Sequence, residues 1–362
     1  MKYAGGDATT AYDEIHAPEI ISETLPAESM MGSFNLPSTD IMASQAATTS
    51  DMQEPVASSD PSPIPQKPEL HSLISAPDFA VVAQKELSAK GRSLCHFRCW
   101  HATDTSEAWA FYSSAATDLV THGMNKKLLR RIMFRPRILR DVGTVSTKTT
   151  VLGQETGVPF FISPAAMAKL AHKDGELALA RGAGSENIIH CVCHPIARYA
   201  NDPWLICHKV SSNASYPLAS IVGAGRPGQP FFLQLYVNSD RPKTTDLLRK
   251  ARSLGVKAIF VTVDAPVAGK READERIAAV AVSAAISGAV AGNDRKGGGM
   301  GRIMAQYVEK RLTWKDLQWI KDVSGLPVVL KGVQSAADAK MAVEWGVDGI
   351  MLSNHGGRSL DT

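Results

Sequence analysis

Short runs of apolar residues alternate with helix-like segments along the second half of the chain. Five of these runs are PFFISPAA (159–166), FFLQLYVN (231–238), AIFVTVDAP (258–266), PVVLKGV (327–333) and GIMLSNHGG (349–357). A weaker sixth run, ENIIH (186–190) or VSSNA (210–214), falls between the first two. Nearly continuous apolar strands separated by helices are typical of a parallel sheet buried on both faces. The pattern therefore predicts an α/β fold, either a doubly wound sheet or a (β/α)₈ barrel.

Helix signals accompany these strands. SAPDFAVVAQKELSAK (75–90) and AWAFYSSAATDLVTH (108–122) have helix-like composition, and Thr313–Asp316 and Ser335–Asp338 resemble helix N-caps with an acid three residues on. The basic stretch KKLLRRIMFRPRILRD (126–141) predicts a solvated helix face followed by a docked connector.

Polar residues at the strand ends distinguish the two folds. They fall at the carboxyl end of consecutive strands, as a barrel's catalytic mouth requires, and no GxGxxG follows the first strand as a doubly wound nucleotide fold would have. A barrel is therefore favoured, but only six of its eight strands are found, so we expect an incomplete TIM barrel. The last pair of barrel strands normally carries a phosphate site, and we expect the chain to be truncated there. The polar strand-end residues are Gln234, Tyr236, Thr262, Asp264, Lys331, Asn354 and His355.

Composition narrows the classes of protein. The chain has 362 residues, 44% of them hydrophobic, and its net charge of +3 gives no argument for nucleic acid as a partner. We find no apolar run long enough to predict a membrane span and no secretory signal, so the default expectation is a cytoplasmic protein. The Ser- and Pro-rich composition of residues 27–68 predicts a disordered linker. It separates a short N-terminal segment, 1–26, from a large domain over 69–362.

The charged residues at the predicted mouth suggest a reaction. His355 can take a proton near neutral pH, and Asp264 can hold the resulting imidazolium. Arg358 and Arg271 offer planar groups suited to a substrate carboxylate, and Lys331 adds a further cation. This combination predicts proton removal next to a carboxylate. Because no side chain accepts the electrons, it also implies a cofactor.

Each residue also has a plain structural interpretation. Asp264, before Ala-Pro, can cap a turn; Tyr236 can be a core tyrosine; Lys331 can be a surface lysine. The KGGGMG run (296–301) is ordinary loop composition, since no GK[ST] follows it. The convergence of several strand ends is what favours the functional interpretation.

These residues resemble a known family. The motifs SNHGGRSLD, LQLYVN, VTVDAP with GKRE, LKGVQ and FRPRILRDV are similar to those of the FMN-dependent α-hydroxy acid dehydrogenases and oxidases. AWAFYSSAATD and the linker arrangement look most like the fungal flavocytochrome branch. The resemblance covers about Ser75 to Thr362 and implies oxidation of an (S)-2-hydroxy acid, such as lactate, to the 2-oxo acid.

The resemblance also implies roles for individual residues. His355 would be the base, Asp264 would stabilise its protonated form, and Tyr236, Arg271 and Arg358 would bind or orient the substrate. Lys331 would stand beside the reduced FMN ring. Residues 268–310 would form a flexible loop. The remaining FMN contacts would come from Pro164, Ala165, Ala166, Ser211, Gln234 and Thr262.

Further expectations follow from the same resemblance. The segment 1–26 looks like the end of a b-type cytochrome domain, with His16 as a vestigial haem ligand; no metal is expected on this chain. The electron acceptor would be oxygen or a cytochrome, and the family suggests a homotetramer. A full-length relative would be placed in the mitochondrial intermembrane space.

The sequence also departs from the family pattern. Phe111 replaces a usual substrate-binding tyrosine, and Ala115 replaces a usual glycine. Segments 91–107 and 191–209, which contain all five cysteines, interrupt otherwise continuous joins. We hypothesise that both inserts are translated introns; a Cys/His metal site is the rival interpretation. The alternative to catalysis is a truncated or mis-annotated family member that does not hold FMN, and a third possibility is a different phosphate-binding barrel used as an interaction module.

Overall fold

The structure, a computed structural model, describes residues 68–88, 105–193, 214–276, 282–283, 290–291 and 307–361. All of them belong to one compact unit, Lys67–Thr362. Several sequence predictions therefore lie outside the described residues. These are His16, the expected cytochrome remnant, the linker up to residue 67, Ser211, most of both inserts and most of the loop expected over 268–310.

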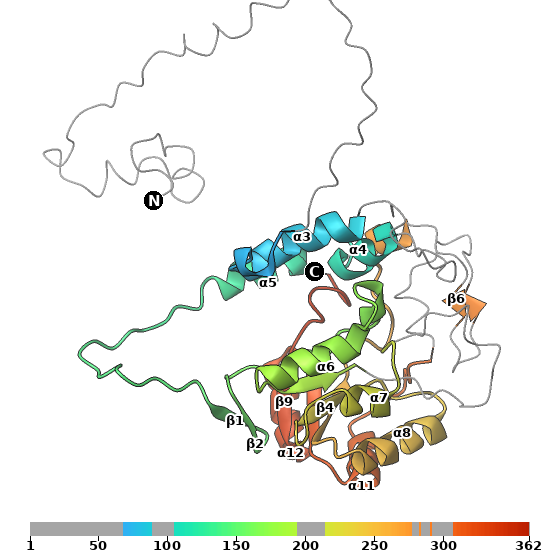
Figure 1. Cartoon of the computed structure of the whole chain (residues 1–362). Helices are drawn as coiled ribbons and strands as arrows, with labels where there is room; N and C mark the ends of the chain where they lie inside the picture. Colours follow the sequence, from blue (N-terminus) through green and yellow to red (C-terminus); the bar gives the residue numbers. More distant parts are fainter. Residues whose placement is uncertain are drawn as a thin grey trace, which may run out of the picture. The chain divides into compact units, whose positions relative to one another are not determined.

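The centre of this unit is a five-stranded parallel sheet (Figure 1). Each strand pairs in parallel with the next one along the chain, except that two short strands intervene in sequence before β8. This order is the repeating strand–helix arrangement that the apolar runs predicted. The strands, in spatial order, are β3 (His190–Val192), β4 (Phe231–Leu235), β5 (Ala258–Thr262), β8 (Val328–Val333) and β9 (Gly349–Leu352).

The prediction of a first strand over residues 159–166 was wrong. Residues 159–166 contribute one parallel bridge, Ile162 to His190, in place of a strand. Pro159 and Pro164 flank this bridge and have no N–H to extend a ladder. Within the described residues the sheet thus has five strands and one bridge, and it does not close into a barrel.

One face of the sheet is covered by helices. Alternate strand residues, such as Leu233, Val261 and Leu330, pack with helix residues such as Ile221 and Leu248 into the larger apolar core. This alternation is the two-residue period of a strand, and it makes the covered strands apolar on that face. The covering helices are α6 (Gly175–Ser185), α7 (Leu218–Gly223), α8 (Arg241–Ser253), α11 (Asp316–Ser324) and α12 (Ala336–Glu344).

The opposite face of the sheet carries a second, smaller apolar cluster. Away from the carboxyl ends of the strands, this face is filled by aromatic residues. The ring centres of Phe232 and Phe260 lie 5.2 Å apart, and the ring centre of Phe161 lies 5.9 Å from that of Phe232 and 5.7 Å from that of Phe260. Toward the carboxyl ends of β4, β5 and β8, the inward positions change from apolar to polar residues. The aromatic residues therefore pack next to the polar residues at the strand ends, on the same face of the sheet.

The remaining elements lie around this sheet. Two helix-start predictions are confirmed: the Asp78 carboxylate accepts hydrogen bonds from the backbone N–H groups of Ile74 and Ser75, and Ser335 caps α12 through the backbone N–H of Asp338. The prediction that Thr313 is a helix N-cap was wrong, because the N-cap of α11 is Lys315; the backbone N–H and hydroxyl of Thr313 instead donate to the Asp316 carboxylate. The other elements are η3 (Leu70–Ser72), α3 (Ala76–Ser88), α4 (Thr105–Ser113), α5 (Val120–Leu129), β1 (Thr149–Val151), β2 (Gln154–Thr156), η4 (Ala168–Leu170), α9 (Glu272–Glu275), β6 (Val282–Ser283) and β7 (Val290–Ala291).

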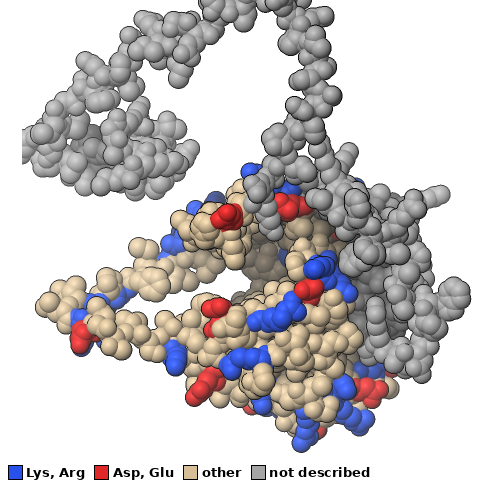
Figure 2. All heavy atoms as spheres, viewed as in Figure 1, with Lys and Arg blue, Asp and Glu red and all other residues tan. Residues whose placement is uncertain are grey.

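The connector predicted to dock after α5 is instead exposed. Residues 130–148 form an extended arm that projects from the sheet, visible in Figures 1 and 2. Phe134 and Leu139 are 99% and 97% exposed. Apolar side chains this exposed carry no packing energy within the described residues, so the prediction of a docked connector was wrong.

The borders of the two proposed inserts also differ from expectation. Cys191 and Val192 are fully buried residues of β3, and Cys193 directly follows them, whereas the sequence placed all three in the second insert. Helix α4 begins at Thr105, inside the first insert. The described residues at these borders therefore belong to regular structure.

Candidate active site

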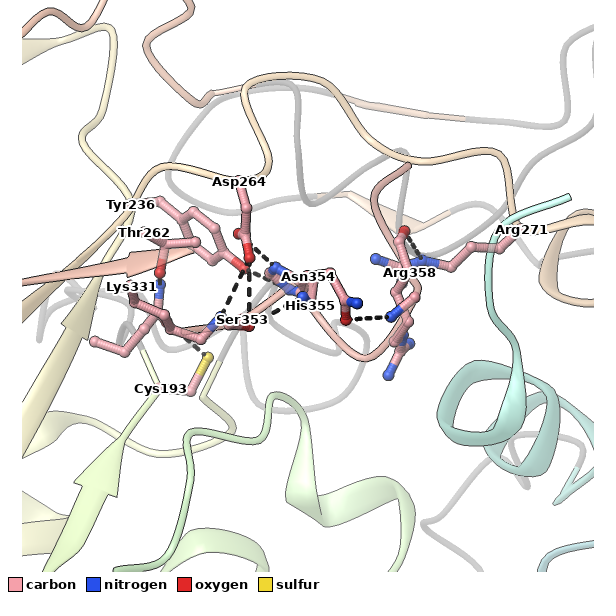
Figure 3. Close-up of polar contacts among 12 residues, drawn as sticks. Cys193, Tyr236, Thr262, Asp264, Arg271, Lys331, Ser353, Asn354, His355 and Arg358 are labelled. Carbon is pink, nitrogen blue, oxygen red and sulfur yellow. Dashed lines mark hydrogen bonds and ion pairs between the residues drawn. The ribbon is translucent and has the colours of Figure 1, made fainter. Parts of the chain in front are cut away.

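Polar side chains from the carboxyl ends of the strands surround a cavity of about 320 Å³ (Figure 3). Helix α4, the segment after β5 and the loop after β9 supply the rest of its lining. The sequence-predicted residues that line it are Phe111, Pro164, Ala165, Ala166, Gln234, Tyr236, Arg271, Lys331, His355 and Arg358. Two further predicted residues, Asp264 and Thr262, stand directly behind this lining and bond to it.

His355 lies between a carboxylate and a phenol. Its Nδ1 is 2.8 Å from Asp264 Oδ1, and its Nε2 is 3.3 Å from the hydroxyl of Tyr236. Because an ionised carboxylate only accepts hydrogen bonds, the Nδ1 must carry the proton. The neutral imidazole then presents the lone pair of Nε2 to the tyrosine and the cavity.

Asp264 is the buried anchor of this group. Its side chain is completely shielded from solvent, and its Oδ2 lies 3.8 Å from Lys331 Nζ. The Ser353 hydroxyl lies 3.4 Å from both of these groups and also accepts the backbone N–H of His355 at 3.0 Å. A buried carboxylate needs compensating partners, and here the imidazole, the ammonium and the serine supply them.

The titration behaviour of His355 follows from this environment. Burial lowers the pKa of His355 most strongly, the hydrogen bond to Asp264 raises it, and the positive charges of Lys331 and Arg271 lower it. The net direction is downward, which favours the neutral imidazole near neutral pH. Burial also raises the pKa of Tyr236, so the phenol remains a hydrogen-bond donor.

A second polar group lies on β4 and β5. Gln234 donates through Nε2 to Thr262 Oγ1 at 2.8 Å, and its Oε1 accepts from Cys193 Sγ at 3.3 Å. Both the amide and the threonine are buried. These partners fix the orientation of the amide of Gln234, one face of which borders the cavity.

Two arginines form the opposite side of the cavity. Arg358 donates to the backbone carbonyl of Phe111, and its guanidinium lies 5.1 Å from the centre of the Phe111 ring. Arg271 donates through Nε to the backbone carbonyl of Arg358 at 3.3 Å. Burial, and then the charge of Arg271, lowers the pKa of Arg358 to about 10. Two partly buried cations close together favour an anion in this part of the cavity.

The wall made by residues 164–166 is narrow and uncharged. Tyr112 fixes it by donating to the backbone carbonyls of Ala166 and Met167, at 3.0 and 2.8 Å. Small side chains and backbone groups here leave room for a flat ring. The sequence did not identify Tyr112 as part of this wall.

Other neighbours were also missed by sequence reasoning. Cys193 was assigned to an insert, although its alternation with Cys191 along β3 would have placed both on the inner face. Ser353 was not assigned a role, and its position two residues before His355 was the available signal. The negative charge of Asp274 raises the pKa of both Arg271 and Arg358. No sequence signal distinguishes Asp274 from its acidic neighbours.

Among the described residues, no group of three or more His, Cys, Asp or Glu side chains is arranged to hold a metal ion. None of the described helices combines the length and apolar character required to cross a bilayer.

Comparisons with known proteins agree on one family. Residues 102–362 match the sequence profile of the FMN-dependent dehydrogenases. The chain is 35% identical over 364 residues to L-lactate dehydrogenase (cytochrome) of Wickerhamomyces anomalus, covering all of this chain and 55% of that protein. Glycolate oxidase 3 of Arabidopsis thaliana is 37% identical over 257 residues, covering 69% of this chain and 64% of that protein. The chain thus spans about half the length of the curated cytochrome-type relatives it matches.

Solved structures show the same relationship. The flavin-binding domain of baker's yeast flavocytochrome b2 superposes with a TM-score of 0.63 at 36% identity, covering 81% of this chain and 62% of that chain. Mandelate oxidase with (S)-4-hydroxymandelic acid gives a TM-score of 0.57 at 29% identity, covering 70% of this chain and 67% of that chain.

Proposed function

The chain belongs to the FMN-dependent dehydrogenase family, and on this premise we propose that it oxidises an (S)-2-hydroxy acid to the 2-oxo acid with FMN. The observation that carries the proposal is the pairing of His355 with Asp264 at 2.8 Å at the edge of a cavity lined by two arginines. A base and an anion-binding group within one cavity are what proton removal beside a carboxylate requires.

The arginines bind and orient the substrate in this proposal. Arg358 and Arg271 attract its carboxylate, which brings the neighbouring α-carbon toward His355. Tyr236, whose hydroxyl lies 3.3 Å from His355 Nε2, orients the substrate hydroxyl. Conversion to the 2-oxo acid removes two protons and two electrons from the substrate. His355 accepts one of these protons at Nε2, Asp264 stabilises the imidazolium through Nδ1, and the electron pair and the other proton would pass to bound FMN.

The cavity also fits the ring of FMN. Gln234 and Lys331 offer polar atoms along one side, and the backbone at Pro164–Ala166 offers a narrow wall on another. When bound, FMN supplies the acceptor for the two electrons that leave the substrate. Thr262 contributes by holding the Gln234 amide, and the ammonium of Lys331 favours negative charge on the ring.

The finer details of the proposal rest on the relatives. L-lactate dehydrogenase (cytochrome) and glycolate oxidase suggest lactate or glycolate as the hydroxy acid, and a cytochrome or oxygen as the acceptor. The proposal also includes a cytochrome remnant over residues 1–26. For a full-length relative, it includes a closed barrel and a location in the mitochondrial intermembrane space. A homotetramer stays a prediction.

One observation favours a second candidate, a family member that does not hold FMN. Strand β9, the last in the sheet, exposes 41% of Ile350 and 75% of Leu352. Parallel sheets are normally covered on both faces, so within the described residues β9 lacks the cover that strands beside a cofactor normally have.

Flavin binding separates the two candidates. Purified protein is mixed with FMN, desalted and examined for the absorbance of oxidised flavin, and L-lactate or glycolate is then added without oxygen. Retained flavin that is bleached by either acid supports the oxidation. Protein that retains no flavin at any FMN concentration supports the second candidate.

A further inference from the structure

The loop that carries His355 and Arg358 has an unusual backbone. Residues His355, Gly356 and Gly357 all have positive φ angles, +61°, +71° and +75°. Glycine adopts this region freely, but a histidine does not. The conformation of His355 must therefore be held by contacts elsewhere in the loop.

A pair of asparagines provides one such contact. Asn125 of α5 donates through Nδ2 to Asn354 Oδ1 at 2.9 Å, and Asn354 donates through Nδ2 to Asn125 Oδ1 at 2.8 Å. The same Oδ1 of Asn354 also accepts the backbone N–H of Gly357 at 3.1 Å. Asn354 Oδ1 thus links α5 to the residues before and at the end of the positive-φ segment 355–357.

The loop touches α5 at two further places. A Cβ added to Gly357 would lie 2.7 Å from the backbone nitrogen of His122, so the loop backbone packs directly on the helix. Farther along, the carboxylate of Asp361 accepts the backbone N–H groups of Val120 and Thr121, at 3.1 and 2.7 Å. These are helix N-terminal donors that need a partner.

Helix α5 does little else within the described residues. None of its residues is buried, and Met124, Leu128 and Leu129 are exposed. The contacts of α5 described above are all with the loop that follows β9. Support of that loop is therefore the role that these contacts indicate for the helix.

From this arrangement we propose that Asn125, which does not line the cavity, is a positioning residue that holds the His355 loop through Asn354. Through this contact the loop keeps His355 against Asp264 and Arg358 beside the carbonyl of Phe111. The proposal rests on the proposed function only for the roles of His355 and Arg358.

The test uses two variants of the same helix. Asn125→Ala removes the asparagine pair, whereas Lys127→Ala is the control because Lys127 is exposed on α5. Alanine favours helix, so both variants are expected to fold. The pKa of His355 is measured by NMR titration of its ring nitrogens, and oxalate affinity by calorimetry; neither measurement requires flavin.

The expected results differ between the variants. Because burial is the largest cause of the lowered pKa of His355, loosening the loop moves this pKa upward toward its ordinary value of about 6.5. Oxalate binds about tenfold more weakly when Arg358 is less well placed. Lys127→Ala matches the wild type in both, and Asn125→Ala/Asn354→Ala changes them at least as much as Asn125→Ala alone, because it also removes the acceptor for the backbone N–H of Gly357.

The opposite result is equally clear. If Asn125→Ala lowers the melting temperature but leaves the His355 titration and oxalate affinity equal to those of Lys127→Ala, the pair is only structural and the proposal is overturned. A wild-type protein that retains no flavin contradicts the proposed function instead, and the His355 titration still decides the role of Asn125.

Discussion

Gly332 lies against Asp264 so closely that a Cβ built on the glycine would stand 2.6 Å from both Cβ and Cγ of the aspartate. Its φ of +113° is also one that L side chains rarely adopt. The position coincides with a shift in the register between β8 and β9. Because the glycine has no side chain, Asp264 has room to reach His355.

Substituting this glycine should therefore disturb the site. We expect Gly332→Ala to displace Asp264 and reduce turnover about 100-fold, which is less than the loss of about 10⁴-fold seen when a catalytic histidine loses its aspartate altogether. Gly346→Ala is the matched control, because Gly346 also has a positive φ (+63°) but nothing within 4 Å of its added Cβ. Steady-state kinetics on both variants checks the expectation; equal losses in the two would show that backbone strain alone is responsible.

The charge of Asp264 can be tested separately from its shape. Asp264→Asn removes the negative charge and replaces the charged acceptor for His355 Nδ1–H by a weaker, neutral amide oxygen. The charge of Asp264 and the hydrogen bond to it both raise the pKa of His355. We expect this pKa to fall further and turnover to drop by up to about 10⁴-fold. Asp246→Asn, at an exposed position of α8, is the control. A pKa of His355 that is unchanged in Asp264→Asn would argue against the pair.

The sequence predicted the sheet because nearly continuous apolar runs between helix-like segments are a local signal. In the structure, Leu233 and Leu235 face the helices, whereas Phe232 and Gln234 face the opposite side of the sheet, where the cavity lies. These four consecutive residues show the alternation of a strand. Strand ends in a parallel sheet share one edge, so the gathering of Lys331 and His355 also followed from the strand assignments. Family resemblance, more than spacing, supplied the expected role of each residue.

Other features depend on contacts that no local pattern encodes. The Asn125–Asn354 pair joins residues 229 positions apart, and the support of residues 164–166 by Tyr112 spans 54 positions. The connector within the basic stretch 126–141 was predicted to dock because apolar residues recur every few positions in it, but this recurrence does not identify what those residues would pack against. Proline 159 was read as the start of a strand although it cannot donate to one.

Phe111 gives a prediction about substrate binding. Its ring lies under the guanidinium of Arg358 and borders the cavity. We expect Phe111→Tyr to add a hydroxyl that donates to the substrate carboxylate, lowering KM up to about tenfold, which corresponds to one hydrogen bond to a charged group. Phe134→Tyr, on the exposed arm, adds the same hydroxyl away from the cavity and should leave KM unchanged. A KM for Phe111→Tyr that equals or exceeds that of the wild type would be evidence against this placement of the carboxylate.

His190 gives a prediction about stability. Burial lowers the pKa of His190 to about 4, whereas an unfolded histidine titrates at about 6.5. Between these values the unfolded chain binds the extra proton, so the free energy of unfolding falls as pH decreases, by up to about 1.4 kcal/mol per pH unit. Urea unfolding at several pH values should show a shallower decrease for His190→Leu.

The control for this prediction is His71→Leu, which replaces an exposed histidine. It should keep the pH dependence of the wild type. If His190→Leu and His71→Leu lose stability equally between pH values of about 7 and about 5, His190 is not the group responsible.

The central claim is that His355 is the base of a flavin-dependent oxidation, and rapid mixing of FMN-loaded protein with L-lactate or glycolate in the absence of oxygen tests it most directly. The account predicts that the wild-type flavin is bleached, and that His355→Ala retains FMN but is not bleached by either acid. Bleaching of the His355→Ala flavin at the wild-type rate would contradict the account.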